Sequence, residues 1–333
     1  TGSRAKIPNI KGLDEVAYLT NETLFDLRKA PSHLAIIGGG PIGLEMAQAH
    51  ARLGIETTLI EMNRFMMGHE RRFVEPVEQS LIDDGVNILE KTFVNRVKKD
   101  KANIKLHLSS GEVLLASDLL IAAGRVPNIE QLALEKAGVK YNEFGVTVDR
   151  NLRTTNKLVY AIGDIVEGSR FTHTASYHAG IVLKKILLGL PSKLRTDHIP
   201  QVTYTDPEIA SVGMNFEDAV KRFGKKIERS CVSLKNNDRA ITDSKTEGFV
   251  EVILLGKKVI GCSITSKNAG ELISFWAFLI AKNIKISNIN AMVPPYPTLG
   301  EVNKRVVSEY YAPKVFGSKL LKFYIAVTQK IFT

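Results

Sequence analysis

The order of apolar and polar positions predicts a βαβ unit near the start of the chain. The apolar run from His33 to Ile37 predicts a buried strand, and a helical pattern follows as far as Leu53. Gly54 ends this helix, and Glu56 to Glu61 predicts a second strand. Short apolar strands that alternate with helices are typical of a parallel sheet in an α/β domain.

Similar signals continue along the next part of the chain. The segment from Val94 to Leu115 predicts a β-hairpin or meander. Two further apolar runs, Leu119 to Ala123 and Leu158 to Ile162, predict buried strands that each end at a glycine. A helical pattern then runs from about Thr174 to Leu188.

The order of predicted elements changes at about His198, where short strands come first and helices follow. This order is typical of a separate α+β domain. The predicted strands are Gln201 to Tyr204, Phe249 to Leu255 and Val259 to Ser263, and the predicted helices are Ala269 to Asn283 and Leu299 to Tyr310.

Composition narrows the classes of protein. A length of 333 residues suggests two or three domains. The net charge of +10 is spread without a long basic run, which argues against a nucleic-acid-binding arm. No apolar stretch is long enough to cross a bilayer, and no secretory signal pattern is visible. The cysteines, Cys231 and Cys262, fit neither a disulfide framework nor a metal motif, so we expect a cytoplasmic protein without a metal site.

The strongest chemical signal is the glycine-rich loop between the first strand and helix. Gly38 would allow the tight turn, Gly40 the approach of a pyrophosphate, and Gly43 the packing of helix on strand. Pro41 and Ile42 open the helix, whose N-terminal N–H groups would face the phosphates. The loop predicts a dinucleotide site.

Glu61 stands where such a site holds its acidic residue, 18 residues after Gly43 at the end of the second strand. A carboxylate there accepts hydrogen bonds from the ribose hydroxyls and repels a 2′-phosphate, which favours NAD over NADP. Arg64 is close enough in sequence to receive that phosphate, so NADP stays open.

Further motifs stand in one recognisable order. They are Thr1-Gly2-Ser3, the glycine loop, Gly124-Arg125-Val126-Pro127-Asn128, Tyr160-Ala161-Ile162-Gly163-Asp164, Tyr204-Thr205-Asp206-Pro207-Glu208, Ala269-Gly270-Glu271 and Tyr296-Pro297-Thr298-Leu299-Gly300-Glu301. In these motifs the chain resembles the class I pyridine nucleotide-disulfide oxidoreductases, the FAD-dependent family of dihydrolipoamide dehydrogenase, glutathione reductase and mercuric reductase. The resemblance runs from Thr1 to about Pro313.

The resemblance implies a domain organisation within the α/β class. It implies a Rossmann-like NAD(P)-binding domain at residues 31–148 and an α+β interface domain, which forms a homodimer, at residues 197–333. Residues 149–196 would be the second segment of an incomplete FAD domain, and residues 1–30 a linker remnant of that domain.

The resemblance also implies roles for single residues. Asp164, after Gly163, would bind the ribityl chain of the flavin, and it would stand at the carboxyl edge of a sheet. Gly124 and Arg125 would lie near the cofactors. Glu45 would pair with a lysine beside the flavin, although it also suits the first turn of a helix.

The family's chemistry needs a flavin, a Cys-x-x-x-x-Cys pair and an acid–base residue from the partner subunit. This chain has one glycine-rich fingerprint, and Cys231 and Cys262 are too far apart in sequence to be that pair. We expect the flavin fingerprint, the cysteine pair and the lysine to precede Thr1. The chain would then be an inactive C-terminal portion of a flavoenzyme that does not hold FAD tightly.

Tyr296 decides between branches of the family. Thiol-handling members carry histidine there, in His-Pro-x-x-x-Glu, and Glu301 is the glutamate of that motif. A phenol is a poor proton shuttle at neutral pH, and mercuric reductases carry tyrosine, so the mercuric-reductase-like branch is favoured over dihydrolipoamide dehydrogenase. The tail contains no cysteine pair for delivering mercury, which makes mercury reduction doubtful. The alternative to an enzyme is a non-catalytic module that binds NAD and dimerises.

Two surfaces are expected to meet partners. Phe275, Trp276 and Phe278 predict an apolar helix face that a homodimer would cover. The tail, residues 314–333, is an amphipathic basic helix that would lie on a membrane surface or pack on its own domain or the dimer partner.

Overall fold

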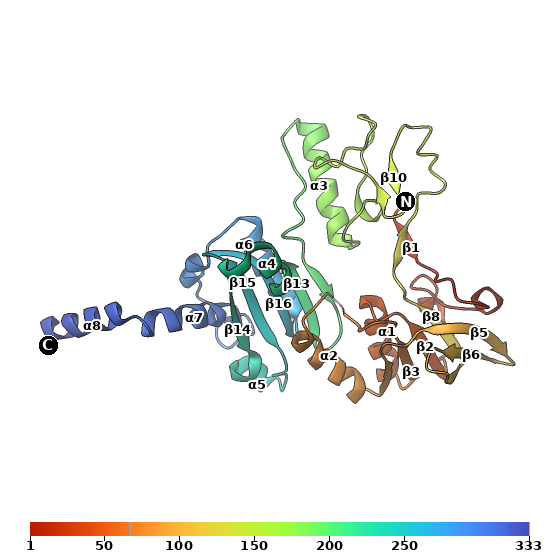
Figure 1. Cartoon of the computed structure of the whole chain (residues 1–333), viewed down its shortest axis with the longest axis horizontal. Helices are drawn as coiled ribbons and strands as arrows, with labels where there is room; N and C mark the ends of the chain where they lie inside the picture. Colours follow the sequence, from red (N-terminus) through yellow and green to blue (C-terminus); the bar gives the residue numbers. More distant parts are fainter. Residues whose placement is uncertain (67, 333) are drawn as a thin grey trace. The chain divides into compact units, whose positions relative to one another are not determined.

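The chain forms two compact units. The computed structural model describes residues 1–66 and 68–332. The first unit comprises Thr1–Gly68 and Leu81–Thr196, and the second comprises His69–Ser80 and Asp197–Thr333 (Figure 1). One boundary between the units falls between Thr196 and Asp197, and residues 69–80, which the sequence placed in the NAD(P)-binding domain, group with the second unit. The predicted division into domains stays a prediction.

A four-stranded parallel sheet is the centre of the first unit. Its strand order is β4-β3-β2-β8, and helix α1 (Pro41–Arg52) joins β2 to β3 (Figure 1). The strands are β2 (His33–Ile37), β3 (Glu56–Ile60), β4 (Val86–Leu89) and β8 (Asp118–Ile121). The apolar side chains of β2 and β3 are buried on both faces, which is why the apolar runs alone predicted them correctly.

Smaller sheets complete this unit. The predicted meander is confirmed as β5 (Val94–Asp100), β6 (Asn103–Leu108) and β7 (Val113–Ala116). Strand β1 (Ser3–Ala5) pairs antiparallel with β9 (Arg125–Pro127), and this pairing ties the start of the chain to the Gly-Arg motif. A hairpin of β10 (Tyr141–Asn142) and β11 (Gly145–Val146) follows.

The strand predicted at Leu158 to Ile162 is wrong. Leu158 is 91% exposed, and within the described residues the segment makes a single bridge, between Tyr160 and Arg153. A strand needs a partner along its length, and an apolar run cannot supply one by itself. Asp164 therefore lies in the short 3-10 helix η3 (Gly163–Ile165), not at the edge of a sheet. The predicted helix after it is confirmed as α3 (Thr172–Leu188).

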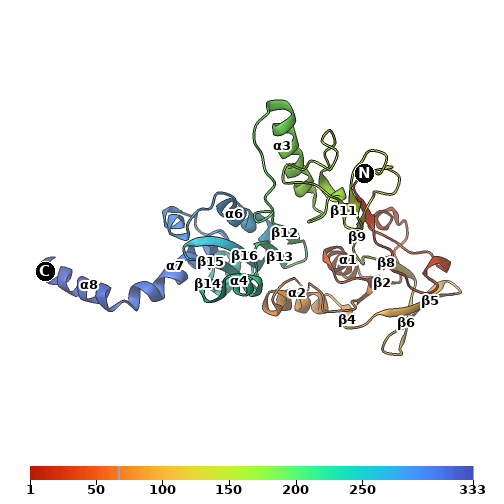
Figure 2. The same cartoon turned by 45° about the horizontal axis from the view of Figure 1, so that its top comes forward.

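A five-stranded antiparallel sheet is the centre of the second unit. Its order is β12-β13-β16-β15-β14, and α6 and α7 pack on it (Figures 1 and 2). The strands are β12 (Gln201–Thr203), β13 (Glu208–Gly213), β14 (Ile227–Ser233), β15 (Phe249–Leu255) and β16 (Lys258–Ser266). The helices of this part of the chain are α2 (Arg71–Asp83), α4 (Phe216–Phe223), α5 (Asp238–Thr242), α6 (Ala269–Ala281), α7 (Glu301–Phe316) and α8 (Lys319–Phe332).

The apolar face predicted on α6 is wrong in one residue, Trp276. Trp276 is fully buried, and its indole N–H donates to Asn303 Oδ1 at 2.8 Å, so it belongs to the core of the unit. Phe278 is 57% exposed and remains available to a partner. Glu271 and Ser274, the polar positions of α6, are exposed and share one side of the helix with Phe278, so the helical spacing of the polar residues marks the aromatic side chain that faces outward.

Candidate functional site

The glycine-rich loop lies where β2 passes into α1, and two of its glycines are required by the backbone. Gly38 has φ +115°, and a Cβ there would collide with the carbonyl group of Ala122. A Cβ on Gly43 would collide with the carbonyl oxygen of Gly38, because the first turn of α1 packs directly on the loop. These contacts are what the fingerprint predicts for its first and third glycines.

Gly40 is different, because a Cβ there would meet nothing within 4 Å. It is the N-cap of α1, and no side chain caps that end of the helix. The first N–H groups of a helix have no partner in the helix and favour an anion. The loop thus leaves open space beside the first N–H groups of α1.

Glu61 is held in place by the same loop. Its carboxylate accepts a hydrogen bond from the Gly39 N–H at 2.7 Å and another from the Asn63 N–H at 2.8 Å. Both oxygens are therefore oriented before any ligand arrives. The sequence predicted the position of Glu61, and the structure adds its contact with the loop.

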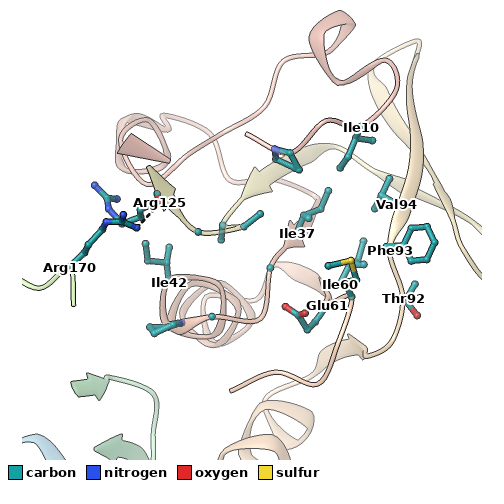
Figure 3. Close-up of a pocket in the computed structure, with 18 of the residues that line it drawn as sticks. Ile10, Ile37, Ile42, Ile60, Glu61, Thr92, Phe93, Val94, Arg125 and Arg170 are labelled. Atoms are coloured by element: carbon teal, nitrogen blue, oxygen red, sulfur yellow. Dashed lines mark hydrogen bonds between the residues drawn. The ribbon is translucent and has the colours of Figure 1, made fainter. Parts of the chain in front are cut away.

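A cavity of about 690 Å³ opens in front of the loop and Glu61 (Figure 3). Its wall is mainly apolar, and the charged residues that line it are Glu61, Arg125 and Arg170, the two arginines lying together away from Glu61 in the view. Arg64 is exposed and is not among the lining residues. The predicted cofactor residues in the wall are Gly38, Gly40, Pro41, Ile42, Glu61, Gly124 and Arg125. Gly43, Gly163, Asp164 and Glu45 are not part of it.

Ser3, Arg125 and Asp164 form a second polar cluster in the first unit. The Ser3 hydroxyl donates to Asp164 Oδ2 at 2.6 Å, and Arg125 Nε donates to Ser3 Oγ at 2.7 Å. A further bond joins Arg125 Nη2 to the Ser3 carbonyl at 2.7 Å, and Arg125 Nε lies 3.9 Å from Asp164. Three motifs far apart in sequence thus converge, and Ser3 is the member that site prediction omitted.

Arg170 and His178 support this cluster, and no sequence motif pointed to either residue. Arg170 Nη1 donates to the Arg125 carbonyl at 2.7 Å. The Gly163 N–H donates to His178 Nδ1 at 3.1 Å, so that nitrogen is unprotonated. Burial lowers the pKa of His178, which keeps the ring neutral near pH 7.

Tyr296 lies in the second unit and is 70% exposed. Its hydroxyl donates to Asp238 Oδ2 at 2.9 Å, and this hydrogen bond raises the pKa of the phenol above its usual value. Glu301 instead accepts from the Thr298 N–H at 3.4 Å. Asp238, which sequence reasoning missed, is therefore the residue that orients Tyr296.

The cysteines lie apart in the second unit, Cys231 on β14 and Cys262 on β16, and both are free thiols. Burial raises the pKa of each, so neither is a ready thiolate. Within residues 1–66 and 68–332, no group of three His, Cys, Asp or Glu side chains could hold a metal ion. No helix in the same residues is long and apolar enough to cross a membrane.

Two family models match the chain. The model described as "Pyridine nucleotide-disulphide oxidoreductase" matches residues 1–179, and that described as "Pyridine nucleotide-disulphide oxidoreductase, dimerisation domain" matches residues 199–307. Both extend over regions where the sequence motifs carried the resemblance.

Similar curated proteins include a mercuric reductase of Bacillus cereus, 33% identical over 314 residues that cover 92% of this chain and 50% of the relative. A dihydrolipoyl dehydrogenase of Staphylococcus aureus is 33% identical over 310 residues, covering 91% and 65%. The chain thus spans half to two-thirds of the length of these relatives.

Solved structures agree with the fold. The Cu(II) complex of the HOCl-induced flavoprotein disulfide reductase RclA from Escherichia coli has a TM-score of 0.85 at 27% identity, covering 92% of this chain and 71% of that one. LpdA from Mycobacterium tuberculosis has a TM-score of 0.84 at 25% identity, covering 93% and 68%. The α/β fold with a following dimerisation domain is thereby confirmed.

Proposed function

Because the chain belongs to the pyridine nucleotide-disulphide oxidoreductase family, we propose that its first unit binds the nicotinamide cofactor of a flavoprotein oxidoreductase. An oxidoreductase of this kind would pass hydride from NAD(P)H through FAD to a dithiol centre. The observation that supports this proposal is the geometry of the loop. It has open space at Gly40, and beside it the Glu61 carboxylate is held by a hydrogen bond from the Gly39 N–H.

The residues in the wall fit a dinucleotide. The pyrophosphate would lie on the uncapped N-terminus of α1, where Gly40 leaves room for it. Glu61 would accept the ribose hydroxyls, and its charge would repel a 2′-phosphate. Arg64 is outside the wall, so NAD is the favoured cofactor.

The Ser3–Arg125–Asp164 cluster would face the flavin. When bound, FAD supplies the hydride relay between the nicotinamide and the dithiol. Asp164 would receive the ribityl hydroxyls on its remaining acceptor positions, while Ser3 and Arg125 hold its carboxylate in position. Glu45, on α1, would contact the flavin's lysine partner as the family pattern implies.

The second unit would provide the dimer interface and Tyr296. In the mercuric-reductase-like branch Tyr296 would line the partner's site, where Asp238 keeps the phenol protonated and Glu301 steadies the preceding turn. Dihydrolipoamide dehydrogenase is the second candidate, and Tyr296 in place of histidine disfavours it.

The chain as it stands would bind the nicotinamide cofactor without turning it over. It has one glycine-rich fingerprint and no Cys-x-x-x-x-Cys. We expect purified protein to be colourless and inactive toward disulfides with NADH. A stoichiometric flavin absorbance band, or turnover by this chain, would contradict that expectation.

The cofactor site is tested by calorimetric titration of NADH and NADPH. Wild type should prefer NADH, and Glu61→Ala should weaken NADH binding by about tenfold, the value of one lost hydrogen-bonding group. NADPH binding should weaken less, because the repulsion is lost as well. Glu56→Ala is the matched control, since Glu56 is an exposed carboxylate at the other end of β3. Equal effects of the two substitutions would reject the assignment of Glu61.

A further inference from the structure

Helix α8 is a strongly basic element at the end of the second unit. Its sequence contains Lys319, Lys322 and Lys330 and no acidic residue. It lies beyond the residues that either family model matches, since the second match ends at residue 307. Its role is therefore not accounted for by the proposed function.

The helix is amphipathic in a simple geometric sense. At 3.6 residues per turn, Leu321, Tyr324 and Ile325 share one side, while Lys319 and Lys322 fall on the other. Tyr324 is 64% exposed, and Phe323, which falls on the same side as the lysines, is 70% exposed. Large apolar side chains on a regular helix thus face solvent beside a row of lysines.

Helix α8 has few neighbours in its own unit. It contacts the end of α7, and both views show it continuing from there away from the five-stranded sheet (Figures 1 and 2). Phe316, at the end of α7 and close to α8 in sequence, is a further large apolar side chain that is exposed. Helix propensity does not require an apolar side on α8, and the contacts with α7 do not cover that side. The exposed apolar side therefore calls for a partner surface.

We propose that α8 docks on the surface of an anionic lipid bilayer, with its apolar side in the interface and its lysines toward the headgroups. A lysine-bearing polar side and large apolar residues on the opposite side are the properties of interfacial helices. A second copy of α8 would cover the apolar side but would leave the lysines, on the opposite side, without acidic partners, because α8 carries no acidic residue. The anionic leaflet faces the cytoplasm, which agrees with the location expected from the sequence.

The test is co-sedimentation of the full chain with vesicles of phosphatidylcholine alone or mixed equally with phosphatidylglycerol. Binding should require the anionic lipid and should fall as salt rises. Lys319→Glu/Lys322→Glu should reduce binding by about twentyfold or more, because each lysine near an anionic surface contributes a factor of about five. Tyr324→Ser/Ile325→Ser should reduce it as well, because the apolar side is then lost.

The matched control is Lys225→Glu/Lys226→Glu, which changes the net charge equally at exposed lysines outside α8. It should retain most of the binding. Unchanged emission of the single, buried Trp276 will show that each variant remains folded. The proposal is overturned if the two pairs of lysine substitutions reduce vesicle binding equally, or if neutral vesicles bind as well as anionic ones. It is also overturned if the chain never binds vesicles and the α8 substitutions instead abolish self-association or binding to an acidic protein.

Discussion

Two glycines three residues apart in the loop have separable roles. Gly40→Ala should leave the free energy of unfolding almost unchanged, because the new methyl group meets open space, but it should weaken NADH binding, because it occupies the approach to the α1 N-terminus. Gly43→Ala should instead destabilise the first unit by about 1–3 kcal/mol, the usual cost of overpacking. Urea unfolding and NADH titration of both variants measure the two effects.

The matched control for these variants is Gly180→Ala. Gly180 lies within α3, where a Cβ would meet nothing, so alanine should be neutral or stabilising by up to about 1 kcal/mol. If Gly40→Ala unfolded the protein as Gly43→Ala does, the space at Gly40 would be needed for folding and the cofactor role would lose its support.

Local sequence patterns were enough to predict the glycine-rich loop. The site residues that were not predicted depend on contacts between distant parts of the chain. Gly38, Gly43 and Glu61 belong to one βαβ unit, so their spacing is visible in sequence. Ser3 and Asp164 are 161 residues apart, and only the folded chain shows that they share a hydrogen bond. Asp238 escaped prediction for the same reason, because it lies 58 residues from Tyr296.

At the scale of elements, the start of α2 is fixed to the sheet of the second unit by a buried ion pair. Arg72 donates to Glu251, which is 2% exposed in the middle of β15, and the Thr265 hydroxyl donates to the Phe73 carbonyl at 2.7 Å. Arg229 is a more distant partner, 3.7 Å from Glu251. The sequence pattern could not show this, because α2 and β15 are separated by most of the chain.

Removing Arg72 should produce a pH-dependent loss of stability. Burial raises the pKa of Glu251, and the hydrogen bond from Arg72 opposes that rise. In Arg72→Met the pKa of Glu251 rises further. Near neutral pH the folded state is then destabilised, because Glu251 is either charged and buried without its partner or must take up a proton. The expected loss is about 3 kcal/mol near neutral pH, and it shrinks as the pH falls toward the unfolded carboxyl pKa of about 4.3.

Urea unfolding followed by Trp276 emission measures this loss, because Trp276 reports on the core of the same unit. Arg71→Met is the control, since Arg71 pairs with glutamates on its own helix and should cost only about 0.5 kcal/mol. A loss that stayed constant from neutral pH to about pH 5 would show that packing, not the charge of Glu251, determines the effect.

For the whole molecule, the division into two units places the proposed cofactor site and the dimerisation-domain match in different units. Every residue that lines the cavity belongs to the first unit, and the dimerisation-domain match belongs to the second. Phe278, on α6, is an exposed aromatic residue over a well-packed core. A homodimer formed through the second unit would cover it, and the dimer could then be broken without touching the cofactor site.

Phe278→Asp should therefore convert a dimer at micromolar concentration into a monomer, because a buried, unpaired carboxylate in an apolar interface costs several kcal/mol. Analytical ultracentrifugation gives the oligomeric state, and calorimetry should show unchanged NADH affinity. Phe25→Asp is the control, since Phe25 is an exposed aromatic residue of the first unit. A wild-type monomer would reject the dimer, and a dimer that survives Phe278→Asp would place its interface elsewhere. If dimer and NADH binding were lost together, the two units would be coupled and the cofactor site would depend on the partner subunit.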